Sequence, residues 1–173
     1  MRRDYVGLWS PAIGAEGGLL AYGHHGKPLL VFQSEQGRCS DYEDRGMIHV
    51  IAGLIEAGRV KVYSVDSYDA ASWCDPDLPL EARAVQHAKF EDWILNQVVP
   101  FIHADCAGPA EPASATLTCG TVEENLHGNR VVRDALAARG WQVTLAEHRD
   151  AHNWVAWRDT FDPWLVGLLQ ELW

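Results

Sequence analysis

The sequence predicts an α/β fold, with one three-layer domain in which helices cover both faces of a mostly parallel sheet. Three observations favour this class. Predicted strands and helices alternate along the 173 residues. Residues 28–32 form a continuous apolar run of the buried-strand type, and a crossover helix separates them from the next strand, residues 60–66. Apolar residues make up 47% of the chain and charged residues 22%, as in a globular protein with a packed core.

The first half of the chain is predicted to begin with three strands. Residues 4–10 and 17–23 form two short strands joined by a Gly/Pro-rich turn, ahead of the buried strand. A helix over residues 45–57, ended by Gly58, then leads to the fourth strand. A helix between two strands implies parallel pairing of those two strands.

A long helix is expected over residues 80–99. It follows Pro79 and carries apolar residues at helical spacing on one face. Pro100 has no N–H donor, so it is predicted to kink or end this helix. Residues 107–114 are rich in proline and form the linker-like seam of a single domain over residues 1–173.

The chain beyond the seam is predicted to follow the order β-α-β-α. In order, these elements are a strand over residues 115–119, a helix over 124–139, a strand over 142–147 and a helix over 158–173. Gly140 suits the C-terminal end of the first of these helices.

Composition limits the partners and the location that the sequence favours. The formal net charge is −10 at pH 7, and Lys and Arg are scattered, so no nucleic-acid partner is expected. No stretch of about 18 apolar residues occurs, which predicts no membrane association and a cytoplasmic protein. The four cysteines form no C-x-x-C pair, so free thiols are expected.

No metal or cofactor is expected. His148 and His152 are four residues apart with Asp150 between them, but the glutamate of an H-E-x-x-H zinc motif is absent. The segment also has the pattern of a loop, whereas that motif lies on a helix.

Eight short segments resemble a bacterial esterase family that is related to the enterochelin esterases. In the first half of the chain these are residues 22–32, 42–47, 58–66 and 98–102. In the last third they are residues 120–125, 129–130, 136–140 and 152–158. The resemblance covers nearly the whole chain, and it implies a reduced α/β-hydrolase fold and hydrolysis of carboxylic esters.

The nucleophile of such an enzyme is missing from this chain. An α/β hydrolase places its serine in G-x-S-x-G on a sharp strand-to-helix turn, and none of the seven serines lies in that pattern. Only the seam separates Phe101 from Thr118, where the family carries the nucleophile strand. Either an internal deletion or the joining of two esterase pieces accounts for this. The strand at 115–119 is then expected to lie beside residues 28–32.

His152 matches the catalytic histidine of the family. That residue takes the proton of the nucleophile and returns it to the leaving group, a role suited to a pKa of about 6.5. Glu123 or Glu124 matches the acid of the triad, with Glu123 preferred, because the acid precedes the histidine in chain order. Acidic residues at the start of a helix also favour its dipole, so a purely structural role stays open for both glutamates.

The loop after the third strand matches the segment that donates an N–H to the oxyanion hole. This loop covers Gln33–Arg38, with Ser34 and Gly37 as its candidate residues, and glycine allows unusual backbone angles. Cys119 is the best substitute nucleophile, although a buried structural thiol is the favoured interpretation. Ser34, Ser40 and Ser67 lie near strand ends, but each also suits a turn or a helix cap.

Two functions follow from these features. The first is an esterase-lineage hydrolase, weakly active or a pseudoenzyme, that takes a small ester or acyl ligand. The second is a non-catalytic binding protein or a homo-oligomer built on the same fold, since a shortened sheet can expose an edge or an apolar patch.

Overall fold

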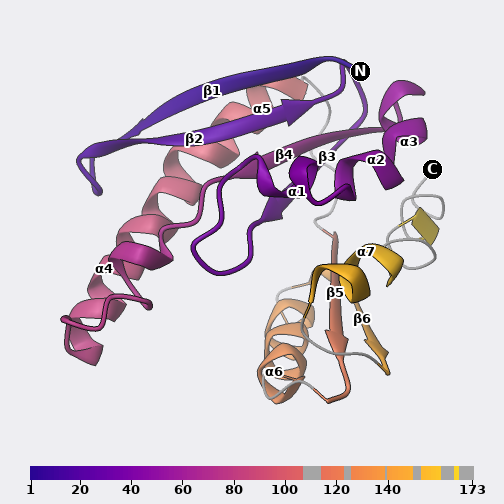
Figure 1. The fold of residues 1–173 in the computed structure, drawn as a ribbon. Helices are drawn as coiled ribbons and strands as arrows, with labels where there is room; N and C mark the ends of the chain where they lie inside the picture. Colours follow the sequence, from indigo (N-terminus) through magenta and orange to yellow (C-terminus); the bar gives the residue numbers. More distant parts are fainter. Residues whose placement is uncertain (107–113, 123–125, 139, 150–152, 161–165, 168–173) are drawn as a thin grey trace. The chain divides into compact units, whose positions relative to one another are not determined.

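The structure is a computed structural model that describes residues 1–106, 114–122, 126–138, 140–149, 153–160 and 166–167 (Figure 1). Its internal contacts divide the chain into two compact units, Met1–Gly108 and Pro109–Trp173. The boundary falls inside residues 107–114, the predicted seam. That both units form one domain stays a prediction.

The first unit is built on a four-stranded sheet with the order β1-β2-β4-β3. The strands are β1 (Arg3–Ser10), β2 (Ala15–Tyr22), β3 (Lys27–Phe32) and β4 (Val60–Val65). β3 and β4 pair in parallel, as the crossover between them predicts. β1 pairs with β2, and β2 with β4, in antiparallel fashion.

The sheet is therefore mixed, and the prediction of a mostly parallel sheet is wrong. The reason lies in the short turn between β1 and β2, where the backbone N–H of Gly14 donates to the carbonyl of Ser10 at 2.8 Å. A connection this short can join only antiparallel strands, whereas parallel strands need a long crossover.

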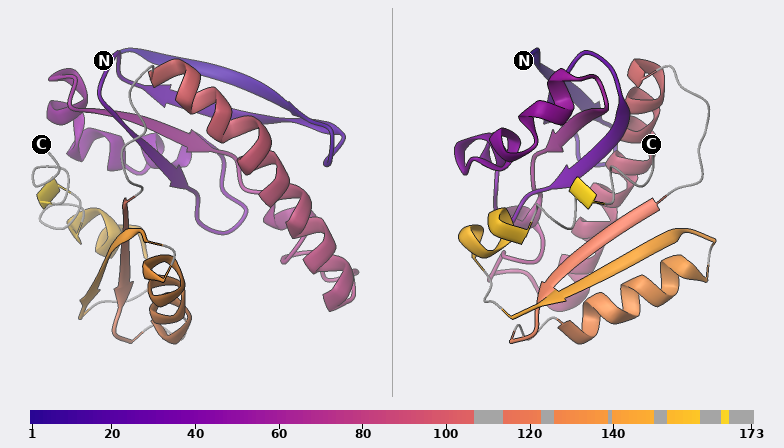
Figure 2. Two further views of the ribbon diagram at one scale, coloured as in Figure 1. Left: turned by 180° about the vertical axis from the view of Figure 1, so that it is seen from behind. Right: turned by 90° about the vertical axis from the view of Figure 1, so that its right-hand side faces the viewer.

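Helices cover both faces of this sheet, as the view along its edge shows (Figure 2). On one face lie α1 (Asp41–Asp44), α2 (Met47–Val50) and α3 (Ala52–Glu56). The sequence predicted one helix over residues 45–57, but Gly46 has a left-handed φ of 78° and Ile51 leaves the helical region. The predicted end is confirmed, since Gly58 has a φ of 68°.

A longer helical rod covers the other face. It consists of α4 (Leu80–Trp93), a π-helical turn η2 (Ile94–Val98) and α5 (Val99–Cys106). Pro100 does not end the helix near residue 99, as one of its two predicted effects required, because the helix continues to Cys106. The predicted kink stays a prediction. The π turn directly before Pro100 already departs from the i to i−4 hydrogen-bond pattern that a proline would break.

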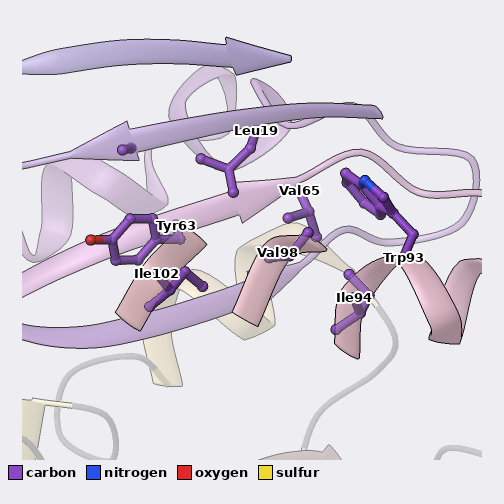
Figure 3. Close-up of a cluster of buried hydrophobic side chains, with 8 residues drawn as sticks. Leu19, Tyr63, Val65, Trp93, Ile94, Val98 and Ile102 are labelled. Carbon is purple, nitrogen blue, oxygen red and sulfur yellow. The ribbon is translucent and has the colours of Figure 1, made fainter. Parts of the chain in front are cut away.

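The core of the first unit lies between the sheet and this rod (Figure 3). Its buried members are Leu19, Ala21, Tyr63, Val65, Trp93, Ile94, Val98 and Ile102. All six residues of β4 are buried, as expected for a strand with neighbours on both sides. The indole N–H of Trp93 donates to the carbonyl of Leu8 at 3.0 Å, which satisfies the polar atom of the largest buried side chain.

A buried ion pair holds α5 to the sheet. The Lys61 side chain on β4 is 5% exposed, and its ammonium group pairs with the carboxylate of Asp105. The hydroxyl of Tyr63 donates to the same carboxylate at 2.8 Å. The Asp105 carboxylate and the Lys61 ammonium thus compensate each other, because burying an unpaired charge is costly.

The second unit has a two-stranded parallel sheet of β5 (Ser114–Gly120) and β6 (Gln142–His148). The helix α6 (Leu126–Ala137) connects these strands, and α7 (Trp154–Thr160) follows β6. Both predicted strands and the first predicted helix are confirmed in kind. A loop was expected up to residue 158, but the chain is helical from Trp154. Most of the helix predicted at 158–173 lies outside the described residues.

The strand pairs of each sheet lie within a single unit. β3 pairs with β4, and β5 pairs with β6. The predicted position of residues 115–119 beside residues 28–32 would join the two units and stays a prediction. In the described part of the chain, no helix combines the length and the apolar character that crossing a membrane requires.

Candidate functional site

The loop after β3 turns sharply at the carboxyl end of the sheet. The backbone N–H of Gly37 donates to the carbonyl of Ser34 at 2.9 Å, which closes a four-residue turn. The left-handed residue of this turn is Gln36, with a φ of 54°. Gly37 was predicted to supply the unusual backbone angles, but it is absent from the residues with positive φ.

Gly37 is needed for space. A Cβ atom at this position would lie 2.7 Å from the carboxylate of Asp41, 2.7 Å from Cβ of Gln33 and 2.9 Å from the carbonyl oxygen of Ser34. The loop is therefore packed too tightly for any other residue here without a local shift.

Asp66, directly after β4, holds the loop in place. One carboxylate oxygen accepts the N–H of Cys39 at 2.8 Å, and the other accepts the N–H of Gly18 on β2 at 2.9 Å. The next residue, Ser67, donates its N–H to the carbonyl of Gly37 at 3.0 Å. The end of β4 thus fixes the loop at two points, and an N–H to carboxylate bond is stronger than one between neutral groups.

Within the loop, the backbone N–H groups of Ser34, Glu35, Gln36 and Arg38 have no acceptor among the described residues. The N–H groups of Gly37 and Cys39 are already used. Of the two candidates named from sequence, Ser34 therefore has an amide that could donate to an oxyanion, whereas the amide of Gly37 serves the turn itself.

Cys39 is a shielded thiol. Burial and the negative charge of Asp66 raise its pKa to about 12, so the thiolate is rare at neutral pH. A thiol in this state is a poor nucleophile, and the residue completes the packing of the loop.

A pocket of about 210 Å³ lies at the carboxyl ends of β3 and β4. Its lining residues are Phe32, Gln33, Asp66, Ser67, Asp69, His87 and Phe90. Ser67 is among the serines considered from sequence, but its Oγ accepts the N–H of Asp69 at 3.1 Å, as a turn-forming serine does. The carboxyl ends of parallel strands are where open α/β sheets bind ligands.

In the second unit, the structure describes one candidate in detail. Cys119 on β5 is 1% exposed, and the side-chain amide of Asn129 lies 3.5 Å from its sulfur. A catalytic thiol must be reached by substrate and ionised. The burial of Cys119 therefore supports its interpretation as a structural thiol. None of the four cysteines forms a disulfide.

The ends of β5 and β6 are tied together beside Cys119. The N–H of Thr121 donates to the carbonyl of His148 at 2.8 Å. The guanidinium of Arg130 donates to both carboxylate oxygens of Glu147 at 2.7 and 2.6 Å, and these hydrogen bonds lower the pKa of Glu147. These contacts order the chain on either side of the predicted acid position.

His152, Glu123 and Glu124 lie outside the described residues, so their roles stay predictions. Among the described residues, no group of three or more His, Cys, Asp and Glu side chains is placed to hold a metal ion.

Sequence reasoning missed Gln33, Asp66 and His87 as functional candidates. A signal for the first two was present, because each polar residue directly follows one of the two parallel strands, at the end where ligands bind. For His87 no such signal exists, since it is one polar residue in a long amphipathic helix.

No family model matches the chain, and no curated protein matches it. Solved structures do. A ferulic acid esterase matches with a TM-score of 0.65 at 10% identity, over 99% of this chain and 98% of that one. An S-formylglutathione hydrolase from Staphylococcus aureus matches with a TM-score of 0.55 at 8% identity, over 97% of each chain.

A dienelactone hydrolase from Anabaena variabilis matches with a TM-score of 0.50 at 12% identity, over 96% of this chain and 97% of that one. At identities this low, these likenesses show the fold alone. The chain therefore has an α/β fold like that of these structures.

Proposed function

We propose that this chain is an α/β hydrolase of esterase lineage, close to the enterochelin-esterase-like family, whose own ester hydrolysis is weak because it lacks the G-x-S-x-G serine. The observation that carries the proposal is the fold likeness to a ferulic acid esterase, which extends over 99% of the chain. The loop after β3 supports it, because the backbone N–H groups of Ser34, Glu35 and Gln36 have no acceptor among the described residues, as donors for an oxyanion must.

In this proposal, His152 is the remaining general base and Glu123 or Glu124 orients it. The loop amides of Ser34–Gln36 supply the oxyanion donors, and the ligand is a small ester or acyl compound. Loss of the nucleophile in a serine hydrolase costs about a million-fold in rate. What remains comes from binding and from oxyanion stabilisation.

The first test is hydrolysis of p-nitrophenyl acetate by the purified chain and by His152→Ala. The matched control is His127→Ala, since His127 is an exposed histidine on α6 of the same unit. A slow rate that His152→Ala abolishes and His127→Ala leaves unchanged supports the proposal. A fast rate that is indifferent to His152→Ala contradicts it.

A covalent probe separates weak catalysis through Cys119 from catalysis through water. Incubation with iodoacetamide under native conditions, followed by peptide mass spectrometry, measures whether Cys119 is alkylated. The burial of Cys119 predicts slow labelling and an unchanged esterase rate in Cys119→Ala. Loss of the rate in Cys119→Ala would instead identify it as the nucleophile.

A second candidate function is self-association through β1. This strand lies at the edge of the sheet and exposes Tyr5 and Trp9, each 61% exposed. Exposed aromatic side chains on an edge strand favour pairing with another copy. Sedimentation velocity of the native chain and of a Trp9→Lys variant tests this: a concentration-dependent dimer that the substitution removes supports it, and a monomer at all concentrations contradicts it.

A further inference from the structure

We propose that the pocket at the carboxyl ends of β3 and β4 binds a small organic cation that carries N–H donors, of the arylammonium or alkylammonium class. The described residues that line the pocket all lie in the first unit, from Phe32 to Phe90. It uses none of the residues assigned to ester hydrolysis in the second unit, so it does not rest on that proposal.

The size of the pocket limits the ligand to about one ring and a short substituent. Its volume is about 210 Å³. A cavity of about 150 Å³ in another protein holds a benzene molecule, and drug-sized ligands need about 300 Å³ or more.

The charge of the lining selects a cation. Asp66 and Asp69 both line the pocket, and its described lining contains neither Lys nor Arg. Each carboxylate oxygen of Asp66 accepts one backbone N–H, and an ionised carboxylate has about four acceptor sites in total. A concave site with two carboxylates and no cation attracts a positively charged ligand.

Two buried polar atoms in the lining lack partners. Gln33 donates its Nε2 to the hydroxyl of Ser64, which leaves its Oε1 buried without a hydrogen bond. The Nδ1 atom of His87 is likewise buried without one. The oxygen can only accept, and a neutral imidazole nitrogen can accept, so both are of the type that receives a ligand N–H group. Neither atom is exposed to water, so contact with a ligand requires a small rotation of each side chain toward the pocket, and an unpaired buried acceptor gains a hydrogen bond by that rotation.

Aromatic side chains complete the site. The rings of Phe32 and Phe90 both line the pocket and meet edge to face, with centroids 6.5 Å apart. Phe32 is 50% exposed although it ends a strand of the sheet. Phe90 in turn stacks on Tyr68 with centroids 6.4 Å apart, which holds its ring in place. Aromatic faces attract ammonium ions, most strongly where water is excluded.

An organic cation fits these walls better than a metal ion does. Among the described residues, no cluster of three or more metal-ligating side chains occurs, and here the two carboxylates share the pocket with phenyl rings. Divalent metal ions need several oxygen or nitrogen ligands around one point.

The experiment is isothermal titration calorimetry of the full chain with three probes of nearly equal size. These are benzylammonium chloride, neutral benzyl alcohol and sodium benzoate. We expect one saturable site for benzylammonium and binding at least about tenfold weaker for the other two, since a charge-assisted hydrogen bond is worth about that factor.

Two variants tie the binding to this pocket. Asp69→Asn removes a carboxylate from the lining, and His87→Gln replaces the unpaired imidazole. Each is expected to weaken benzylammonium binding by about fivefold or more. Asp77→Asn removes an exposed carboxylate outside the lining and should leave the affinity unchanged. Circular dichroism and thermal unfolding of each variant verify that it is folded, so a misfolded variant is set aside in favour of the other.

Four results would overturn the proposal. Two concern the probes: equal affinity for all three, or no binding of benzylammonium up to 50 mM, about the weakest affinity that calorimetry can detect. The third is wild-type affinity in both folded pocket variants. The fourth is displacement of benzylammonium by magnesium or calcium chloride at matched ionic strength. The last would identify a metal site instead.

Discussion

The carboxylate of Asp66 accepts the backbone N–H of Cys39 at 2.8 Å, and this bond joins the end of β4 to the loop that follows β3. The same side chain accepts the N–H of Gly18 on β2. One residue therefore organises two strands and the loop that carries the candidate oxyanion donors.

Asp66→Ala is expected to lower the free energy of unfolding by about 2–4 kcal/mol, because it leaves two partly buried N–H groups without their charged acceptor. Asp66→Asn should cost less, since the amide retains one acceptor oxygen. Urea unfolding followed by circular dichroism measures both. Asp77→Ala, at an exposed position, is the control and should change stability by less than about 0.5 kcal/mol. Equal stability of Asp66→Ala and this control would show that the hydrogen bonds to Asp66 contribute nothing to stability.

Gly37→Ala is expected to destabilise the protein by about 1–3 kcal/mol, because the new methyl group would overlap the backbone oxygen of Ser34 and the side chain of Gln33. The matched control is Gly53→Ala in α3, where nothing lies within 4 Å of the added Cβ. That change should stabilise by about 0.5–1 kcal/mol, since alanine favours a helix. Thermal unfolding compares the two, and a neutral Gly37→Ala would contradict the tight packing of the loop.

Asp105→Asn is expected to cost about 3 kcal/mol at pH 7, because it leaves the buried ammonium of Lys61 without its counter-charge. Lys61→Met should cost less. It removes the buried charge itself, and the Asp105 side chain that it leaves behind is 32% exposed to water. The reverse order of these two losses, measured by urea unfolding, would argue against a buried, charged lysine.

The same pair gives stability a dependence on acid pH. Burial raises the pKa of Asp105, but the hydrogen bonds from Lys61 and Tyr63 and the lysine charge outweigh it, so the folded-state pKa lies below the ordinary value. The ionised Asp105 therefore contributes fully to the free energy of unfolding above its unfolded-state pKa of about 4. This contribution is lost as the pH falls through the lower folded-state pKa. Unfolding free energies from pH 7 to pH 2 should fall less steeply below pH 4 in Asp105→Asn than in wild type. Parallel curves would contradict the assignment.

Cys39 is expected to resist alkylation in the folded protein. Burial and Asp66 raise its pKa to about 12, whereas a free thiol has a pKa of about 8.5. The thiolate fraction at pH 8 is then roughly a thousandfold lower than in the unfolded chain. Peptide mass spectrometry after iodoacetamide treatment, with and without 8 M urea (roughly the concentration that unfolds most domains), measures this ratio. Equal labelling in both states would show that the loop is open.

The elements of the fold could largely be predicted from the sequence, but their pairing could not. The strand at Leu29 and the helix end at Gly58 follow from local chemistry, and both are confirmed. The burial expected of that strand is wrong, because β3 lies at the edge of the described sheet and only Val31 within it is buried. The apolar pattern of β2 says that it is buried and nothing about its neighbour. Its antiparallel pairing with β4, which makes the sheet mixed, depends on contacts between residues far apart in the chain.

The location of the candidate site could be predicted from the sequence, but the residues that form it could not. The loop after β3 was named from sequence, yet the residue that fixes it, Asp66, comes from the end of another strand. The pocket combines Gln33 with His87 from α4, and no local pattern relates the two. No local pattern predicts the burial of Lys61, which depends on Asp105 from α5.

The number of residues in the π turn Ile94–Val98 sets which face α5 presents to the sheet, and the composition of the turn does not reveal this. Each residue of an α-helix advances the chain by about 100°, so one residue inserted or deleted here would rotate everything that follows by about that angle. Ile102 would then leave the core, and Asp105 would leave Lys61. Exposed positions of the turn, such as Leu95, can vary in identity while the residue count of the segment stays constrained.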